Sequence, residues 1–396
     1  MIVRYPVACM TCTTPHTLRI QIGHEDYQEH AFQCTECGEQ MVIGMRCDQA
    51  KGSYEIVDKD NCQAGEIEGK VINLSPDFPI PADELHKDMA FPSGPHVQQF
   101  MAAQLALGIG PIPAKDYLNV NPALLRRPSN LWPILDKAWS LDRRGRDELA
   151  NEKIAQYFNT QETTKQLADA LYDFCRRMLS VGRVSLYKDA AAFSAKAYAE
   201  HKSEFLRFQN HYKANVRQDN LERHHETLKE YFSCFTDFSQ TFTHAQFNIE
   251  LAQDYEASSS AFSKTKLFYG NAYENLTTNV ATLACINNIS AGRRFDEFLT
   301  MDLKQYLTIN KANRCTPFKD VVPLMNIGKC LDSTIRNASH HGGMKLVNNG
   351  RTIQYRSGGN GAQRTMSYLE YIKACNEMVL STCALLALEL FVMQDA

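Results

Sequence analysis

The 396-residue sequence has no large excess of either charge, since 42 Lys and Arg residues are matched by 45 Asp and Glu residues for a net charge of −3. This balance argues against a general nucleic-acid coat. The N-terminus lacks a secretory apolar core, and no apolar run is expected to be long enough to span a bilayer. The nearest approach, residues 379–393, contains Glu389 and is expected to be a buried helix. We therefore expect a cytoplasmic protein that does not bind membranes.

Proline is missing from a long central part of the chain. Twelve of the fourteen prolines lie at or before Pro133, and none lies between Pro133 and Pro317. Because interior proline breaks helices, residues 134–316 are expected to be nearly all helix, with breaks near 180–182, 258–260 and 291–292. Before this region, the sequence predicts strands at 54–57 and 70–74. Residues 76–133 are too broken for long helices except around 97–107.

A run of large apolar residues marks the helical part of the chain. They recur every seven positions, which predicts a buried seam along one long helix, in a bundle core or at a subunit contact. The residues of this seam are Leu221, Leu228, Phe235, Phe242 and Ile249. His224 and His225 interrupt the seam.

The cysteines do not form a disulfide framework, because nine of the thirteen are scattered and are expected to be reduced, mostly core thiols. The other four form two C-x-x-C pairs, Cys9, Cys12, Cys34 and Cys37. This spacing predicts a four-thiolate zinc site in a small zinc ribbon, with a strand at 17–22 between the pairs. Because such a ribbon has little core, bound zinc would supply on the order of 10 kcal/mol of folding energy. The alternatives are two disulfides, an iron–sulfur centre, or replacement of one thiolate by His16, His24 or His30.

Near the C-terminus, one stretch combines a cation, an amide and two imidazoles: Arg336-Asn337-Ala338-Ser339-His340-His341. Apolar residues at helical intervals from 321 to 335 precede it and Gly342-Gly343 follows, so one amphipathic helix is expected to end here. Arg336 can share a helix face with His340 or, if the last turn unwinds, with His341. Imidazole exchanges protons near neutral pH, and arginine stabilises charge on a phosphorane. These groups suit RNA cleavage without a metal, although a basic cap on the helix end is the alternative.

The stretch resembles the Arg-Asn-x-x-x-His signature of HEPN domains, which are helical modules of toxin, antiphage and CRISPR-associated ribonucleases. As in many relatives, a hairpin is expected next, with strands at 345–347 and 352–355 around the turn Asn349-Gly350, and then one long helix from 363 to 393. The resemblance implies that Arg336 and His341 are catalytic and that Asn337 orients them. It also implies a homodimer in which two copies of the motif face each other.

Basic residues gather around this motif. Residues 336–373 contain six basic residues and one acid, giving a local charge of +5. A positive cleft concentrates an anionic substrate, although ordinary solvated charges of a hairpin are the alternative. The expected RNA-binding residues are His340, Lys345, Arg351, Arg356 and Arg364.

The sequence therefore predicts a mainly α protein with four parts: a β zinc ribbon (1–65), a proline-rich connecting module (66–133), a helical region (134–260) and an HEPN-like domain with a hairpin insert (261–396). The expected function is a metal-independent endoribonuclease that leaves 2',3'-cyclic phosphate ends, acting as a toxin or antiphage effector in abortive infection. The zinc ribbon would recognise RNA, an activator or a protein partner. The alternatives are a non-catalytic HEPN-like scaffold and a zinc-ribbon regulator that binds nucleic acid.

Overall fold

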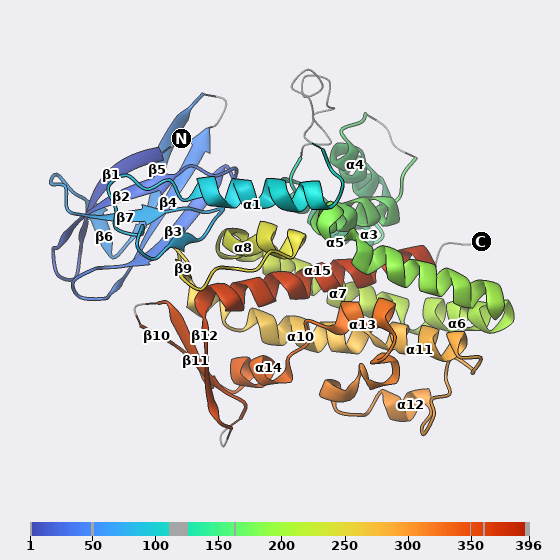
Figure 1. Cartoon of the computed structure of the whole chain (residues 1–396). Helices are drawn as coiled ribbons and strands as arrows, with labels where there is room; N and C mark the ends of the chain where they lie inside the picture. Colours follow the sequence, from blue (N-terminus) through green and yellow to red (C-terminus); the bar gives the residue numbers. More distant parts are fainter. Residues whose placement is uncertain are drawn as a thin grey trace. The chain divides into compact units, whose positions relative to one another are not determined.

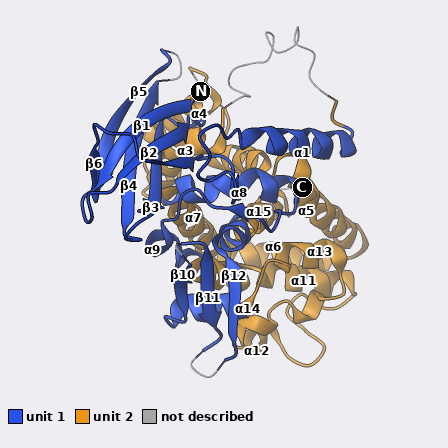
Figure 2. Cartoon of the chain, turned by 60° about the vertical axis from the view of Figure 1, so that its left-hand side comes forward, with its two compact units in different colours: residues 1–108, 234–269, 334–376 blue, residues 109–233, 270–333, 377–396 orange. Residues whose placement is uncertain are grey.

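The computed structural model describes residues 2–48, 51–110, 126–161, 164–348, 350–358 and 361–392. About half of the chain is helical, and it forms two compact units (Figure 2). Unit 1 contains residues 1–108, 234–269 and 334–376, and unit 2 contains residues 109–233, 270–333 and 377–396. The expected module boundaries at 65, 133 and 260 stay predictions, and residues 111–125 of the connecting module lie outside the described residues.

Two β-sheets open unit 1. Strands β6 (Cys62–Ala64), β1 (Ile2–Cys9), β2 (Pro15–Gln21) and β7 (Lys70–Leu74) form the first sheet in this order, with β7 parallel to β2. Strands β3 (Tyr27–Gln33), β4 (Gln40–Asp48) and β5 (Ser53–Asp60) form the second, antiparallel sheet (Figure 1, blue). The strands predicted at 17–22, 54–57 and 70–74 are confirmed.

A single apolar core joins these sheets. It contains Val7, Cys9, Leu18, Ile20, Phe32, Cys34, Met41, Ile43, Met45, Cys47, Cys62, Ile72 and Leu74. Alternating apolar residues in the strands form this core. In strand β4, for example, Met41, Ile43 and Met45 lie on one face and are all fully buried. The expectation that this part of the chain has little core of its own was therefore wrong, whereas the four-cysteine cluster is compatible with a zinc ribbon.

The rest of unit 1 includes helices and two short strands. Helix α1 (Ser93–Ala106) confirms the helix predicted around 97–107. Strand β8 (Ile80–Pro81) pairs with β9 (Tyr255–Glu256). In the sequence, β9 lies between helix α8 (Phe235–Phe247) and helix α9 (Phe262–Thr265). Residues 258–260 are not helical, as predicted.

The predicted hairpin is present, with an addition. Strands β10 (Met344–Val347) and β11 (Thr352–Arg356) are antiparallel, and β12 (Gln363–Ser367) extends them to three strands. Asn349 of the predicted turn lies outside the described residues. The long helix predicted from 363 to 393 was wrong at its start, because α15 spans Tyr368–Val392. The Ser367 hydroxyl accepts a hydrogen bond from the Glu370 amide, and the Glu370 carboxylate accepts one from the Ser367 amide. This reciprocal pair of hydrogen bonds is a capping box, and it fixes where α15 begins.

The amphipathic segment before the motif forms two helices instead of the one expected. Helix α13 (Val322–Gly328) ends in a turn, and α14 (Ser333–His340) begins after Asp332. Aspartate and serine favour helix starts over helix interiors, which accounts for the break. The motif therefore lies on a short helix of its own.

Unit 2 is helical. Its helices include α3 (Pro128–Asp142), α4 (Asp147–Phe158), α5 (Leu167–Glu200), α6 (Lys202–Asn215), α7 (Arg217–Ser233), α10 (Phe268–Asn279), α11 (Ala281–Ser290) and α12 (Leu303–Tyr306), of which α10 begins in unit 1. The predicted breaks are confirmed at Ser180, which has a φ of 51° inside α5, and at Gly292, which follows α11 with a φ of 74°. The prediction that the heptad seam lies on one long helix was wrong. The chain leaves helical geometry at Cys234, so the seam is divided between α7 and α8.

The part of helix α15 that belongs to unit 2 contains a buried carboxylate, that of Glu389. Glu389 is 2% exposed and accepts hydrogen bonds from Asn220 Nδ2 at 2.6 Å and Thr282 Oγ1 at 2.7 Å. His224 Nε2 lies 2.9 Å from its other oxygen. His225, the other histidine of the predicted seam, pairs with Asp136 at 2.7 Å.

By length and composition α15 could cross a membrane, so the expectation that no stretch is long enough was wrong. However, 83% of its most apolar window is buried within the protein, as predicted for residues 379–393. Met393 lies outside the described residues. The buried core of a folded unit accounts for the apolarity of this helix.

Candidate functional site

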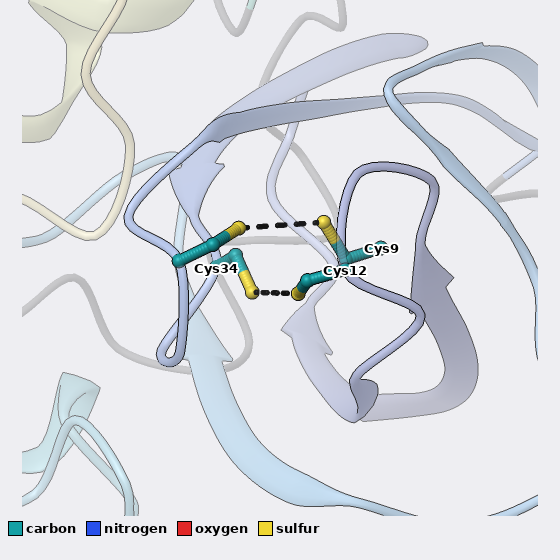
Figure 3. A group of neighbouring side chains, drawn as sticks. Cys9, Cys12 and Cys34 are labelled. Carbon is teal, nitrogen blue, oxygen red and sulfur yellow. Dashed lines mark hydrogen bonds between the residues drawn. The ribbon is translucent and has the colours of Figure 1, made fainter.

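The four cysteines of the two C-x-x-C pairs converge in unit 1. Their sulfur atoms all lie within 4.8 Å of one another. Cys9 Sγ lies 3.8 Å from Cys37 Sγ, and Cys12 Sγ lies 3.5 Å from Cys34 Sγ. Figure 3 shows the side chains of Cys9, Cys12 and Cys34 turned toward one another. The group is a candidate metal site, as the spacing predicted.

Two tight turns hold the sulfurs in place. The Thr13 amide donates to the Cys9 carbonyl, and the Gly38 amide donates to the Cys34 carbonyl. Gly38 has a φ of 76°, a conformation that glycine adopts without strain. Hydrogen bonding with Thr14 lowers the pKa of Cys12 to about 6, whereas burial raises the pKa of Cys34.

The alternatives to a four-cysteine site can now be compared. No disulfide joins any of the thirteen cysteines, all of which lie in the described part of the chain. Six of the nine scattered cysteines are buried and three are half-buried, in agreement with reduced core thiols. His16 Nε2 lies 3.3 Å from Cys34 Sγ, placed beside the cysteines and not in place of one. His24 instead contacts Asp77 at 2.9 Å, and His30 is buried on β3 with no hydrogen-bond partner among the described residues.

The Arg-Asn motif ends helix α14 with a defined cap. The His341 amide still donates to the Asn337 carbonyl, and the Gly343 amide donates to the Ala338 carbonyl. Gly342 between them has a φ of 67°, so the three residues form a Schellman-type cap. Helix α14 ends at His340, but the His341 amide keeps the helical hydrogen bond to Asn337, so the chain has not unwound at His341.

This cap determines which side chains share a face. At about 100° per residue, His340 lies within about 40° of Arg336 around the helix, whereas His341 lies about 140° from it. His341 is instead four residues after Asn337, on the same face. Both imidazoles are exposed. Within one chain, helix geometry thus puts Arg336 and His340 near one face and Asn337 and His341 near another.

Buried contacts fix α14 to its surroundings. The Ser339 hydroxyl and the Tyr371 hydroxyl both donate to the Lys266 carbonyl, at 2.6 and 2.9 Å. On the other side, Arg336 Nη1 donates to Asn337 Oδ1 at 2.8 Å and Asn337 Nδ2 lies 3.3 Å from Ser357 Oγ. Ser357 follows β11, so the motif is linked to the hairpin. No sequence signal pointed to Ser357.

A pocket of about 280 Å³ lies beside the cap, lined by Gly342, Gly343, Lys345, Gln354, Tyr355, Arg356 and Gln363. Two of its residues are cations and none is an acid. Arg356 Nη2 donates to Gln363 Oε1 at 2.9 Å, which holds the guanidinium at the pocket. Of the predicted RNA-binding residues, Lys345 and Arg356 therefore lie next to the motif.

The other two predicted contacts lie elsewhere on the three-stranded sheet. Arg364 is exposed on β12 opposite Tyr355. Arg351 lies at the far end of the hairpin, five residues from Arg356 and so about 16 Å along the strand. Its Nε atom lies 2.8 Å from the Glu256 carboxylate. The structure therefore separates Arg351 from the motif.

Comparison of the chain with protein-family models, curated proteins and solved structures found no match.

Proposed function

We propose that this protein is a metal-independent endoribonuclease of HEPN type. The observation that carries the proposal is the arrangement at the end of α14, where an arginine, an amide and two exposed imidazoles adjoin a pocket lined by Lys345 and Arg356. These are the groups that an RNA backbone needs for cleavage by its own 2'-hydroxyl. The pocket's cations would hold the phosphate next to the cleaved bond.

The proposed reaction needs one proton acceptor, one donor and one fixed cation. An imidazole removes the proton of the ribose 2'-hydroxyl, and the 2'-oxygen attacks the adjacent phosphorus. Arg336 stabilises the negative charge on the phosphorane oxygens. The bond to the 5'-oxygen breaks as that oxygen receives a proton, which leaves a 2',3'-cyclic phosphate and a 5'-hydroxyl.

The angular positions of the residues favour a site built from two chains. Arg336 and His341 point about 140° apart on one helix, so a cleft between two copies of α14 would let Arg336 of one chain and His341 of the other reach the same phosphate. Asn337 shares the face of His341 and would orient its imidazole. The proposed active form is therefore a homodimer in the cytoplasm, acting as a toxin or antiphage effector.

Zinc is the metal that we propose for the four-cysteine site. Zinc–sulfur bonds of about 2.3 Å in a tetrahedron place sulfurs about 3.8 Å apart, and the sulfur–sulfur distances of 3.5 and 3.8 Å fit this spacing. His16 would donate its Nε2 proton to the Cys34 sulfur and lower the charge on that ligand. Four protein ligands leave no open position, so the zinc would be structural.

The experiment that tests the function compares single alanine variants on end-labelled RNA. Arg336→Ala and His341→Ala are expected to abolish cleavage, whereas His340→Ala, at a variable position of the motif, is expected to weaken substrate binding and retain the chemistry. The two histidines are adjacent and equally exposed, so each is a control for the other. Loss of cleavage with His340→Ala and retention with His341→Ala would instead assign the reaction to the Arg336–His340 pair of a single chain.

A further inference from the structure

A second cavity in unit 1 lies away from the motif, with a volume of about 320 Å³. Its lining comes from the β3–β4 connection around Cys34, from strand β7, from residues 85–86, from residues 256–258 and 260, and from the hairpin tip at 350–351. These segments are far apart in the sequence, so only the folded unit forms it. Its volume lies at the lower end of the range for small-molecule sites.

The charged groups of this cavity favour an anion. Lys70 and Arg351 line it with one acid, Glu256, so one positive charge is in excess. Glu256 lies 2.8 Å from Arg351 Nε in an ion pair that lacks the alignment of a hydrogen bond. Lys70 is exposed and forms no ion pair within the described part of the chain. One cation is therefore available to a ligand, and the second, Arg351, is paired with Glu256.

His86 supplies a neutral acceptor beside these cations. Its Nδ1 lies 2.8 Å from the Val71 carbonyl, so Nδ1 carries the proton and donates it. Burial, with smaller effects of Lys70 and Arg351, lowers the pKa of His86, which keeps the ring neutral at neutral pH. Nε2 then holds a lone pair that can accept from an N–H or O–H group.

Ser260 provides a further polar group, because its hydroxyl is buried at the cavity and has no hydrogen-bond partner among the described residues. The remaining lining is mixed, because Phe32, Ile72 and Leu346 are apolar whereas Gln33, Thr35 and Gln40 are polar. A planar ring placed against the three apolar residues would offer its polar edge to His86 and Ser260. The cavity thus joins an anion site, a small apolar patch and an unfilled polar edge.

We propose that this cavity binds one ribonucleotide unit, with its phosphate on Lys70 and Arg351 and its base against the apolar patch of Phe32, Ile72 and Leu346. The unit is either a free nucleoside monophosphate or one nucleotide of an RNA strand. A phosphate on Arg351 competes with Glu256 for the guanidinium, so the ligand loosens the contact between the hairpin tip and residue 256. This inference does not rest on ribonuclease activity.

The test is isothermal titration calorimetry of the full chain carrying Arg336→Ala, which removes the motif cation from the binding measurement. The probes are the four nucleoside monophosphates, inorganic phosphate and a short oligoribonucleotide. We expect a monophosphate or the oligoribonucleotide to bind, with the added Lys70→Ala change weakening binding about tenfold, as for loss of one charge-assisted hydrogen bond. Leu346→Trp, which enlarges a side chain of the apolar patch into the cavity and keeps every charge, is expected to abolish binding.

Lys51→Ala is the matched control, since Lys51 is an exposed lysine on the turn before β5 and does not line the cavity. Thermal melting of each variant establishes that it is folded. Tighter binding of the monophosphate identifies a free nucleotide as the ligand, and tighter binding of the oligoribonucleotide identifies an RNA. The proposal is overturned if no probe binds, if inorganic phosphate binds as tightly as the nucleotides, or if folded Lys70→Ala and Lys51→Ala proteins bind equally.

Discussion

Replacing Glu389 by alanine tests the buried polar network of unit 2. The carboxylate is 2% exposed and faces the Asn220 amide, the Thr282 hydroxyl and His224. Its removal leaves buried donors without an acceptor, at about 1–3 kcal/mol for each such group. We predict that Glu389→Ala lowers the free energy of unfolding by about 4 kcal/mol, a large part of a typical domain's stability.

Urea unfolding followed by tryptophan fluorescence measures this change. Both tryptophans of the chain, Trp132 and Trp139, lie on α3 in unit 2, so the signal reports that unit. Glu200→Ala is the control, because among the described residues the one ion pair of Glu200 is an exposed contact with Lys196 at 3.8 Å. This substitution is expected to cost less than about 1 kcal/mol. Equal losses for Glu389→Ala and Glu200→Ala would refute the reasoning.

Three further predictions follow from unit 1. Atomic absorption is expected to find one zinc per chain, and its removal is expected to expose the four thiols of the cluster to a thiol reagent; iron, or no metal, would contradict the assignment. Burial raises the pKa of Asp237 from 3.8 to about 6, so the folded protein holds this proton more tightly than the unfolded chain. The stabilisation is present below about pH 4 and is lost as pH rises through 6, so Asp237→Asn is expected to gain about 3 kcal/mol at pH 7 in urea unfolding and to flatten the pH dependence. Finally, Lys345→Ala and Arg356→Ala are each expected to lower kcat/KM for RNA cleavage about tenfold, whereas Lys51→Ala is expected to leave it unchanged.

The four-cysteine cluster, a candidate metal site, could be predicted from the sequence because it depends on local spacing. Each C-x-x-C pair forms its own tight turn, and the positive φ of Gly38 permits the turn of Cys34 and Cys37. The strands that carry the two turns then bring the four thiols together. The core around them could not be predicted in the same way. It depends on which faces of β1, β4 and β7 meet, and that is decided by tertiary packing.

The motif shows the same division between local and distant effects. The glycines after His341 predicted the end of α14, and the hairpin followed from its turn residues. The start of α15 was missed although Ser367 and Glu370 form a capping box, a signal that the sequence contains. The contact of Asn337 with Ser357 and the distance of Arg351 from the motif depend on how the hairpin folds back on α14, which residue spacing does not encode.

The most direct test of the central claim is cleavage of end-labelled RNA by the full chain in magnesium-free buffer with chelator, with the protein's zinc content measured before and after the reaction. We predict that the original protein cleaves, that its products carry 2',3'-cyclic phosphate ends, and that folded His341→Ala and Arg336→Ala proteins are inactive. Cleavage that survives both substitutions, or products with 5'-phosphate ends, would contradict the account.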